Sequence, residues 1–398
     1  MSPLHIAVVG AGPVGLALAL LAARRLPEAR ITVFDARPLD RDVAADPRTL
    51  ALSLGSVQLL QQLGAWPGDA AAAIRRVHVS QAPAGITLGG LLGHEPAAVT
   101  LDAAELAVPQ LGAVLAYGTL LAPLQAAWLA LAAAEPQRLG TRFGTPVAAL
   151  KPVAEGVEVD AGIAERFDLA VVAEGGVFAE QARKALVADY GQTAWVGTAT
   201  LATPMDGTAF ERFTPDGPVA LLPLPATAEA AARAALVWCV PTATDPVAPL
   251  SEPQRLALLN SRLPPEAGAV TALSPLKHFA LGLNAERSLV QGRTVRIGNA
   301  AQTLHPVAGQ GLNLGLRDAY TLVDALQRGP AVDAALQRVA FARAPDRWSL
   351  IAATDFLARS FTWRLPGAAA LRSLGLAALQ AAPPAKAALA RQMMFGWR

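Results

Sequence analysis

The chain has 398 residues, of which 53% are hydrophobic and 16% charged, and its formal net charge is +2. This length favours two closely associated domains with a sizeable core, and the 33 dispersed Lys and Arg residues argue against nucleic acid as a partner. One cysteine, Cys239, and five histidines without ligand spacing exclude a disulfide framework and a cysteine-rich metal site. We therefore expect a protein of the reducing cytoplasm that holds no metal.

The N-terminal residues predict a dinucleotide-binding unit. Residues 5–9 are expected to form a buried strand and residues 14–26 an apolar helix, with the pattern GAGPVG between them. A second strand over residues 30–34 ends at Asp35, which is expected to accept hydrogen bonds from a ribose. This Rossmann-type unit alone fits either FAD or NAD(P).

Each glycine of this loop has its own expected role. Gly10 permits the tight turn, Gly12 lets the backbone approach a pyrophosphate, and Gly15 lets the helix lie close to the sheet. The helix start at Pro13 and Val14 presents a partial positive charge to the phosphates.

Two later segments have features of a cofactor site. Arg48 precedes a helical pattern of leucines that ends at Gly64, and its alternative role is a surface ion pair with Asp46. Residues 168–176, DLAVVAEGG, predict a strand that ends at Glu174.

Residues 298–320, GNAAQTLHPVAGQGLNLGLRDAY, contain four glycines around the start of a helix. Such permissive residues carry an entropic cost, so we expect this stretch to pass close to a ligand and to present N–H groups to it. The structural alternative is a glycine-rich loop with Arg317 and Asp318 on a solvated helix face. His305 is a candidate for proton transfer, and its alternative role is that of a satisfied, hydrogen-bonded side chain.

The remaining segments have a different character. Residues 193–240 contain alternating and apolar runs that predict an antiparallel sheet, to which residues 74–101 contribute further strands. Residues 331–398 predict helices with an apolar stripe that Pro383-Pro384 interrupts. The stripe either packs on the protein or meets a membrane or partner proteins. The longest apolar runs are too short to span a membrane.

These motifs together resemble the flavin-dependent aromatic hydroxylases of the para-hydroxybenzoate hydroxylase type. The resemblance rests on the N-terminal fingerprint, DPRTLAL, residues 298–320, GTAFERFTPDGPVALLPLP, ALVWCVP and ATDFLARSF. More narrowly, the chain is similar to the ubiquinone-biosynthesis hydroxylases (UbiH, UbiF and COQ6), and most to the UbiH branch of 2-polyprenyl-6-methoxyphenol hydroxylases. The likeness runs over nearly the whole chain.

The resemblance implies an α/β, para-hydroxybenzoate-hydroxylase-like fold. It has a Rossmann-type FAD domain, an antiparallel-sheet substrate domain and a C-terminal helical tail. The implied boundaries are residues 1–68, 108–187 and 290–333 for the discontinuous FAD-binding domain, 74–101 and 188–289 for the substrate domain, and 334–398 for the C-terminal helical region.

The resemblance also implies roles for single residues. Arg48 would approach the flavin, and Gly175 would allow a close approach. Glu174 and Asn299 stand where the family usually has aspartates, and Gln125 would substitute for a polar residue that Ala122-Pro123 replace.

In the glycine-rich stretch, Leu312 and Asn313 would meet the pyrimidine edge by backbone and side chain, and His305 and Pro306 would form a wall at the flavin face. The full set of cofactor-binding candidates is Gly10, Gly12, Pro13, Val14, Gly15, Asp35, Ala36, Arg37, Arg48, Gln125, Glu174, Gly175, Gly298, Asn299, Gly309, Gln310, Gly311, Leu312 and Asn313.

The implied activity is FAD-dependent aromatic monooxygenation. NAD(P)H, docking transiently, reduces the flavin, O₂ adds to form a flavin C4a-hydroperoxide, and a polyprenylated methoxyphenol of ubiquinone biosynthesis takes up one oxygen atom. Three alternatives stay open: an NAD(P)-dependent dehydrogenase, a flavin reductase acting on isoprenoid substrates, and a catalytically weak scaffold subunit of a ubiquinone-biosynthesis complex. Expected partners are a lipophilic phenol and O₂, with peripheral membrane contact and other ubiquinone-biosynthesis proteins as open questions for a cytoplasmic protein.

Overall fold

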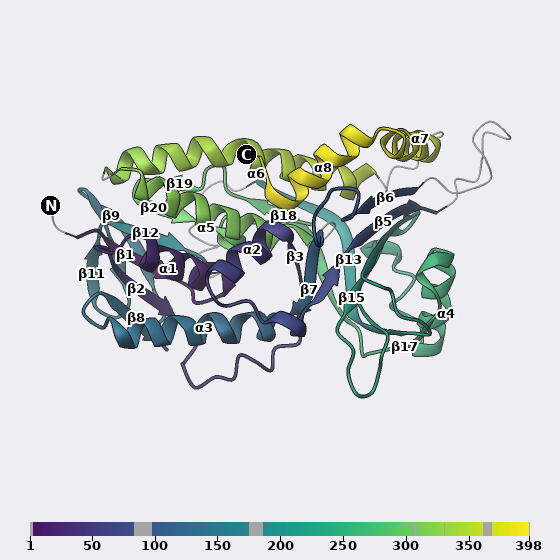
Figure 1. Ribbon diagram of the computed structural model, residues 1–398, viewed down its shortest axis with the longest axis horizontal. Helices are drawn as coiled ribbons and strands as arrows, with labels where there is room; N and C mark the ends of the chain where they lie inside the picture. Colours follow the sequence, from purple (N-terminus) through teal and green to yellow (C-terminus); the bar gives the residue numbers. More distant parts are fainter. Residues whose placement is uncertain are drawn as a thin grey trace.

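The structure is a computed structural model that describes residues 3–82, 98–174, 186–305, 309–329, 331–360 and 368–397. Figure 1 shows an elongated molecule, with a parallel sheet and its helices at one end and a large antiparallel sheet at the other. The two parts share long C-terminal helices along one side (Figure 1).

The first sheet has six strands in the order β19-β20-β12-β1-β2-β8, and every pairing except β19 with β20 is parallel. Its central strands are short, apolar runs, as parallel strands covered on both faces require. The strands are β1 (His5–Val9), β2 (Arg30–Asp35), β8 (Leu139–Phe143), β12 (Leu169–Val172), β19 (Val290–Gln291) and β20 (Thr294–Arg296).

Both faces of this sheet are covered. One face shares a hydrophobic core with α1 (Pro13–Arg25), α3 (Tyr117–Ala134) and α5 (Gly311–Gln327). The other face packs on an antiparallel sheet of three strands, β9 (Ala149–Val153), β10 (Gly156–Asp160) and β11 (Ala164–Phe167). Helix α1 is apolar on nearly all sides because it is buried between the parallel sheet and helices α3 and α5.

A second small sheet links the two ends of the molecule. It has the order β3-β7-β4, with β3 (Thr49–Ser53), β4 (Ala72–Ile74) and β7 (Gly112–Ala116), and α2 (Leu54–Gln62) follows β3 directly. We expected the helix to follow Arg48 at once. Residues 49–53 form a strand instead, because antiparallel pairing with β7 buries Leu52 against the main core.

The large sheet has nine strands in the order β21-β18-β13-β16-β15-β14-β5-β6, with β17 beside β13. All its pairings are antiparallel except that of β14 with β5. Its outer face carries a separate core beneath α4 (Glu252–Arg262). The strands are β5 (Arg76–Gln81), β6 (Ala98–Asp102), β13 (Leu186–Leu201), β14 (Thr208–Thr214), β15 (Gly217–Leu224), β16 (Arg233–Pro241), β17 (Val270–Leu273), β18 (Lys277–Ala285) and β21 (Gln302–Thr303).

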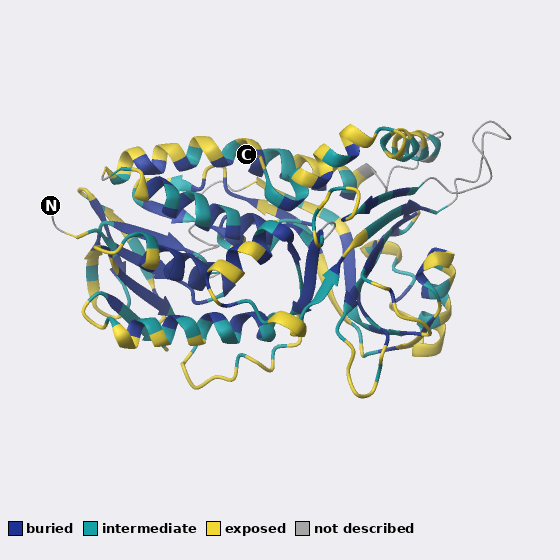
Figure 2. Ribbon diagram, in the orientation of Figure 1, coloured by how far each residue is buried: buried dark blue, intermediate teal, exposed yellow. Residues whose placement is uncertain are grey.

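Three helices complete the chain. α6 (Val332–Ser360) packs on α5, α7 (Ala368–Gln380) on β6, and α8 (Pro383–Phe395) on α2. Figure 2 shows that buried residues concentrate in the sheets and in α1, whereas α6 and α7 carry many exposed ones. The parallel sheet, the antiparallel sheet and the helical C-terminal region confirm the expected α/β class.

Of the helices that the structure describes, α3 alone is long and apolar enough to cross a membrane. Six of its residues, including Trp128, are buried, and it packs against α1 and β8. These contacts are those of a core helix.

Candidate active site

The first glycine loop is tightly packed at both of its ends. Gly10 has a φ of +106°, its N–H donates to the Phe34 carbonyl over 2.8 Å, and a Cβ there would lie 2.5 Å from the Cγ of Glu174. A Cβ at Gly15 would overlap the carbonyl oxygen of Gly10. Both positions therefore require glycine for the loop to close.

The middle of the same loop is open. A Cβ at Gly12 would meet only the hydroxyl oxygen of Tyr117, at 3.5 Å. No side chain caps α1, which begins at Pro13 and has no acidic residue in its first turn. The N-terminus of α1 is thus available to an anion that approaches Gly12.

Asp35 ties the end of β2 to this loop. Its carboxylate accepts hydrogen bonds from the N–H of Ala11 (2.6 Å) and from the N–H of Arg37 (2.7 Å), with Ala36 between. The Arg37 guanidinium donates to the Ala11 carbonyl over 3.1 Å and lies 3.7 Å from Asp35. A carboxylate in this position retains acceptor capacity for a further hydroxyl group.

Arg48 lies over an aromatic ring beside the glycine loop. Its side chain is 68% exposed, pairs with Asp46 at 2.7 Å and stacks 4.2 Å above the Tyr117 ring centre. Hydrogen bonds from Arg48 lower the pKa of Asp46. Arg48 thus forms the surface ion pair with Asp46 that the sequence allowed as its alternative role. Because the Tyr117 ring contacts both Arg48 and the position of Gly12, this ion pair lies near the glycine loop. Tyr117 is a site residue that sequence reasoning missed, although an aromatic residue at the start of an apolar helix was a signal.

The second glycine region contacts the first. Gly298 (φ +60°) begins a short 3₁₀ helix, η5 (Gly298–Ala300), at the end of β20. A Cβ at Gly315 of α5 would lie 2.7 Å from the Cα of Gly298 and 2.9 Å from a methyl carbon of Val14 in α1. Figure 1 shows α1 and α5 side by side. Segments that are distant in sequence therefore meet at the carboxyl edge of the parallel sheet.

Helix α5 begins without a side-chain cap. Gly309 has a φ of +57°, the buried Gln310 is the N-cap residue, and the helix starts at Gly311. Leu312 is half-buried and Asn299 is exposed, and the Oδ1 atom of Asn299 would lie 3.9 Å from a Cβ at Gly311. The first N–H groups of α5 are thus accessible beside Asn299.

The Asn313 side chain has a structural role that differs from the expected one. Its Nδ2 donates to the carbonyls of Ala51 (3.1 Å) and Gly309 (3.0 Å), and its Oδ1 accepts from the Ser53 N–H and the Ser56 hydroxyl, each at 2.8 Å. These four hydrogen bonds occupy both N–H donors and the carbonyl oxygen of the Asn313 amide, and the residue is only 1% exposed. The amide is therefore committed to holding the loop against β3 and α2, and only the Asn313 backbone remains for a ligand.

His305 is buried and hydrogen-bonded. Its Nε2 lies 3.0 Å from the Oε1 of Gln192, whose amide donates to the carbonyl of Ala358, and its ring meets the edge of Tyr190 at 5.3 Å. Burial lowers the pKa of His305 to about 4, so the ring is neutral at neutral pH. This arrangement is that of a satisfied, hydrogen-bonded side chain, which is the alternative role that the sequence left open. Pro306 lies outside the described residues.

The other expected contacts are dispersed. Burial, followed by the nearby charge of Asp35, raises the pKa of Glu174, so this carboxyl faces the first glycine loop. Gln125 lies on α3, and its Oε1 is buried without a hydrogen-bond partner among the described residues. Gly175 lies outside the described residues.

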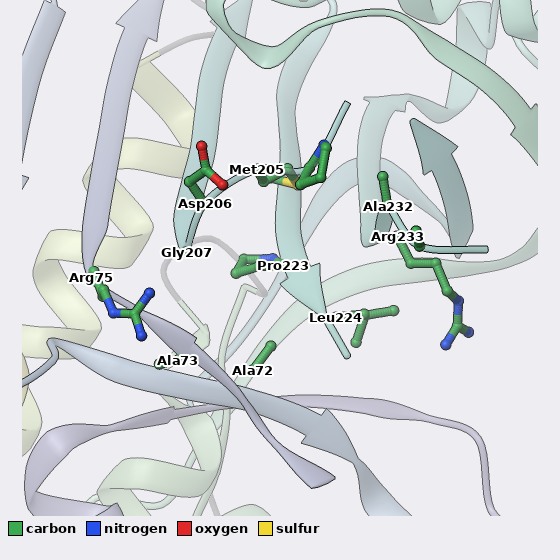
Figure 3. Close-up of a pocket in the computed structure, with 12 residues that line it drawn as sticks. Ala72, Ala73, Arg75, Met205, Asp206, Gly207, Pro223, Leu224, Ala232 and Arg233 are labelled. Atoms are coloured by element: carbon green, nitrogen blue, oxygen red, sulfur yellow. The ribbon is translucent and has the colours of Figure 1, made fainter. Parts of the chain in front are cut away.

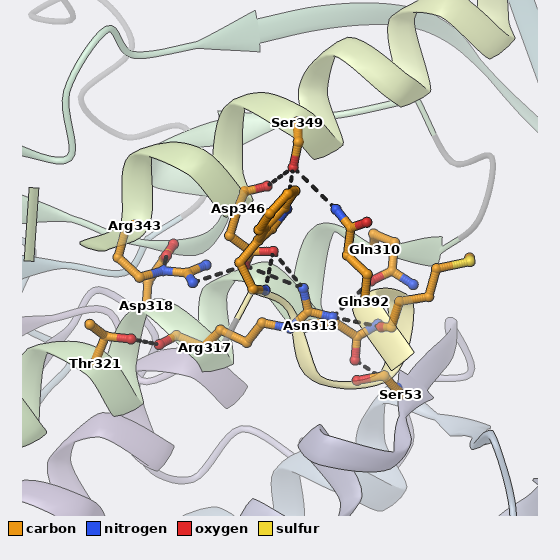
Figure 4. Close-up of polar contacts among 12 residues, drawn as sticks. Ser53, Gln310, Asn313, Arg317, Asp318, Thr321, Arg343, Asp346, Ser349 and Gln392 are labelled. Carbon is orange, nitrogen blue, oxygen red and sulfur yellow. Dashed lines mark hydrogen bonds and ion pairs between the residues drawn. The ribbon is translucent and has the colours of Figure 1, made fainter. Parts of the chain in front are cut away.

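A buried charge network lies behind α5 (Figure 4). Arg343 pairs with Asp318 at 2.7 Å and with Asp346 at 2.8 Å, and Arg317 pairs with Asp346 at 3.4 Å. The backbone N–H of Trp397 donates to Asp346 over 3.3 Å. The alternative in which Arg317 and Asp318 lie on a solvated face is therefore wrong, because α6 and the C-terminal segment cover that face.

A separate pocket of about 210 Å³ opens at one edge of the large sheet (Figure 3). Its lining includes the apolar side chains of Met205, Pro223 and Leu224 and the charged side chains of Arg75 and Asp206. It includes none of the residues of either glycine loop.

Within the described part of the chain, no three His, Cys, Asp or Glu side chains gather in a way that could hold a metal ion. The residues fit a dinucleotide instead. Two uncapped helix N-termini meet through Val14 and Gly315, and the backbone at Gly12 is open to a pyrophosphate.

Comparisons with known proteins agree with this fit. Residues 183–354 match the FAD binding domain family. The chain is 32% identical to the 3-demethoxyubiquinol 3-hydroxylase of Escherichia coli (strain K12) over 403 residues, which cover 96% of this chain and 95% of that protein. It is 35% identical over 212 residues to the ubiquinone hydroxylase UbiL of Rhodospirillum rubrum, which cover 52% of this chain and 48% of that protein.

Solved structures have the same fold. The p-nitrophenol 4-monooxygenase PnpA of Pseudomonas putida DLL-E4 matches with a TM-score of 0.73 and 17% identity over 100% of both chains. Klebsiella pneumoniae HpxO complexed with FAD and uric acid also matches with a TM-score of 0.73 and 17% identity, over 99% of this chain and 96% of that one. The expected hydroxylase fold is thus confirmed, and FAD is the cofactor. The chain belongs to the family of FAD-dependent hydroxylases that includes the ubiquinone-biosynthesis hydroxylases.

Proposed function

We propose that this enzyme hydroxylates the ring of a polyprenylated methoxyphenol in ubiquinone biosynthesis, with NAD(P)H and O₂ as co-substrates. One oxygen atom of O₂ replaces a ring hydrogen as a hydroxyl group, and the other leaves as water. NAD(P)H supplies two electrons and, with one proton from solvent, balances the reaction. The observation that supports this proposal best is the contact of Val14 with Gly298 and Gly315, which unites both glycine regions.

The two glycine regions would hold opposite ends of FAD. The N-terminus of α1 and the open backbone at Gly12 suit the pyrophosphate, and Asp35 suits a ribose hydroxyl. The N-terminus of α5 at Gly311 suits the flavin ring, with Asn299 at the ribityl chain. When bound, the flavin supplies hydride acceptance and oxygen activation.

The chain itself contributes electrostatics and shielding. The uncapped N-terminus of α5 would stabilise negative charge on the ring system by roughly 1 kcal/mol. Asn313 fixes the direction of that helix through its four internal hydrogen bonds. The neutral, buried His305 excludes water from its side of the loop without moving a proton.

The substrate class follows from the relatives. The Escherichia coli relative is a 3-demethoxyubiquinol 3-hydroxylase and the Rhodospirillum rubrum relative a ubiquinone hydroxylase. We assign this chain a ring of the same class, and a 2-polyprenyl-6-methoxyphenol as the specific form. Pro223, Leu224 and Met205 supply an apolar part of the pocket wall, along which an isoprenoid tail would lie.

The test is isotopic. FAD-loaded protein is reduced by NADPH or NADH without oxygen, and labelled O₂ is then admitted with a short-chain 2-prenyl-6-methoxyphenol. Transfer of one labelled oxygen atom to the ring is the expected result. NADPH oxidation that needs neither O₂ nor a phenol would indicate a reductase instead, and FAD binding without any turnover would indicate a scaffold subunit.

A further inference from the structure

The inner face of the large sheet contains a carboxyl group for which the proposed flavin site has no use. Glu211 lies in the middle of β14, on the same face as Ala209 and Phe213. Those two neighbours are buried, whereas Glu211 is half-buried. Among the residues that the structure describes, no hydrogen bond or ion pair involves its carboxyl group. Because a carboxyl group in such surroundings costs free energy unless it is paired, a ligand is the natural partner.

Strand register locates Glu211 in a continuous row. It lies opposite Ala220 of β15 and Val79 of β5. Ala220 lies opposite Val237 of β16, which lies opposite Val196 of β13. We call these five residues the central row. Because neighbouring strands lie about 4.8 Å apart, the central row extends over roughly 19 Å, which is long enough for a substituted ring and part of a side chain.

The residues of the central row are partly accessible to solvent, whereas their neighbours on the outer face of the sheet are buried. All five of its residues are half-buried, although they lie on inner strands of the sheet. On β15, Val219 and Leu221 alternate with Ala220 and are fully buried in the core beneath α4. Among the residues that the structure describes, the outer face of these strands is covered, whereas the central row remains a partly open, mostly aliphatic wall.

Two contacts join the inner face of the large sheet to the glycine-rich stretch around Gly309. The first contact is through Ala51, whose Cβ would lie 3.1 Å from a Cβ placed at Gly309. Ala51 belongs to the same hydrophobic cluster as Ala209 and Leu222 of the inner face. On β13, Gln192 shares the face of Val196 and holds His305. The wall therefore faces the end of the site that the flavin ring would occupy.

We propose that Glu211 hydrogen-bonds to the hydroxyl group of an aromatic substrate whose ring lies on the central row. This inference rests on the proposed function and specifies which feature of the phenol is recognised. The aliphatic members of the central row would contact the ring, and Glu211 would then select for a free hydroxyl. Beyond the central row, Val196 lies opposite the exposed Lys277 of β18, which is the next charged residue along the same line.

The electrostatics of Glu211 suit this role. Burial raises its pKa to about 7, so the carboxyl group can accept or donate a hydrogen bond near neutral pH. Cys239 of β16 lies on the same face, two residues after Val237, and burial followed by the charge of Glu211 raises the pKa of its thiol. A neutral thiol is only a weak hydrogen-bond donor, so it competes less well than a phenol hydroxyl for the carboxylate.

The experiment compares two probes that differ only in the hydroxyl group. FAD-loaded protein is titrated with 2-methoxyphenol and with its methyl ether, 1,2-dimethoxybenzene, and the change in flavin absorbance gives each Kd. The wild type should bind the phenol roughly 10- to 100-fold more tightly than the ether, because a lost hydrogen bond to a charged group has about that effect. Glu211→Leu should abolish the preference and leave the Kd of the ether within about threefold. Glu229→Gln, at an exposed position, is the control that should match the wild type.

Equal preferences in the wild type and in Glu211→Leu would overturn the inference, as would a wild type without any preference. If the leucine variant does not fold, Glu211→Ala is titrated with the same two probes, and a preference for 2-methoxyphenol equal to that of the wild type would overturn the inference. Failure of the proposed function looks different, since the wild type would then incorporate no labelled oxygen into any phenol. Hydroxylation that is intact and indifferent to Glu211 would refute only the inference.

Discussion

Gly12→Val should separate cofactor binding from folding. Gly12 has a φ of −77° and a ψ of 179°, which valine adopts without strain, and its Cβ would meet only the Tyr117 hydroxyl oxygen. The protein should therefore fold with nearly unchanged stability. The added side chain would occupy the space where the pyrophosphate approaches the start of α1.

The loss of affinity can be worked out from the contacts removed. If two N–H groups of α1 no longer reach the phosphates, and each charged hydrogen bond contributes about 1.5–3 kcal/mol, the cost is roughly 3–6 kcal/mol. That corresponds to a reduction of FAD affinity by about two to four orders of magnitude. The assay is fluorescence titration of the apoprotein with FAD, together with circular dichroism and thermal unfolding.

Two controls make the result decisive. Gly375→Val lies on α7 with nothing within 4 Å of its Cβ, so it should leave FAD affinity unchanged. Gly15→Val would overlap the Gly10 carbonyl and should impair folding itself. A folded Gly12→Val protein that binds FAD as tightly as the wild type would refute the location of the pyrophosphate.

The other predictions concern α5 and its neighbours. Asp318→Asn removes one of the two carboxylates that pair with the buried Arg343 and leaves only Asp346, so it should lower the free energy of unfolding by about 1.5–3 kcal/mol in urea titrations. Loss of the exposed pair by Arg359→Ala should cost at most about 1 kcal/mol, and equal effects would contradict the argument. A Cβ at Gly311 would lie 3.9 Å from the Oδ1 of Asn299, so Gly311→Leu should fold but slow flavin reduction by NADPH in stopped-flow experiments. An unchanged rate would mean that this loop does not lie against the flavin ring. Because the pKa of His305 is lowered to about 4 in the folded protein, the unfolded state binds an extra proton between pH 6.5 and 4, so stability should fall as pH drops through that range by up to about 1.4 kcal/mol per pH unit. His305→Gln should remove this part of the pH dependence, and identical profiles would show that another group is responsible.

The sequence predicted the local elements well where one physical requirement dominates. Gly10, Gly15 and Asp35 are fixed by a turn and by close packing, and each lies where the pattern required. The strand over residues 49–53 escaped prediction, because its leucines also fit a helix and only pairing with β7 decides between the two. Propensity is weak where tertiary pairing competes with it.

The side-chain roles were harder to predict, since they depend on which segments meet. Asn313 was expected at the ligand, but its amide bonds to β3 and α2, whose position no local pattern reveals. Arg317 and Asp318 fit a solvated helix face in sequence, and α6 covers them in the fold. The sequence predicted Glu211 only as one residue of a strand. The strand register shows that a small, half-buried residue, Ala220, lies opposite it.

The charge network connects the direction of α5 to the end of the chain. Arg317 of α5 donates to the carbonyl of Met393 in the last turn of α8, and Trp397, just after α8, donates to Asp346 and Ser349 of α6. The end of the chain is therefore bonded to both α5 and α6. An uncapped helix start can stabilise charge on a flavin only if its axis is held, because the effect of a helix terminus decreases within about one turn. The buried ion pairs behind α5 cost desolvation, and apolar packing of equal volume would bury the face as well. What the ion pairs add is a fixed rotation of α5 about its axis, since Asp318 and Arg317 can both reach their partners in only one orientation.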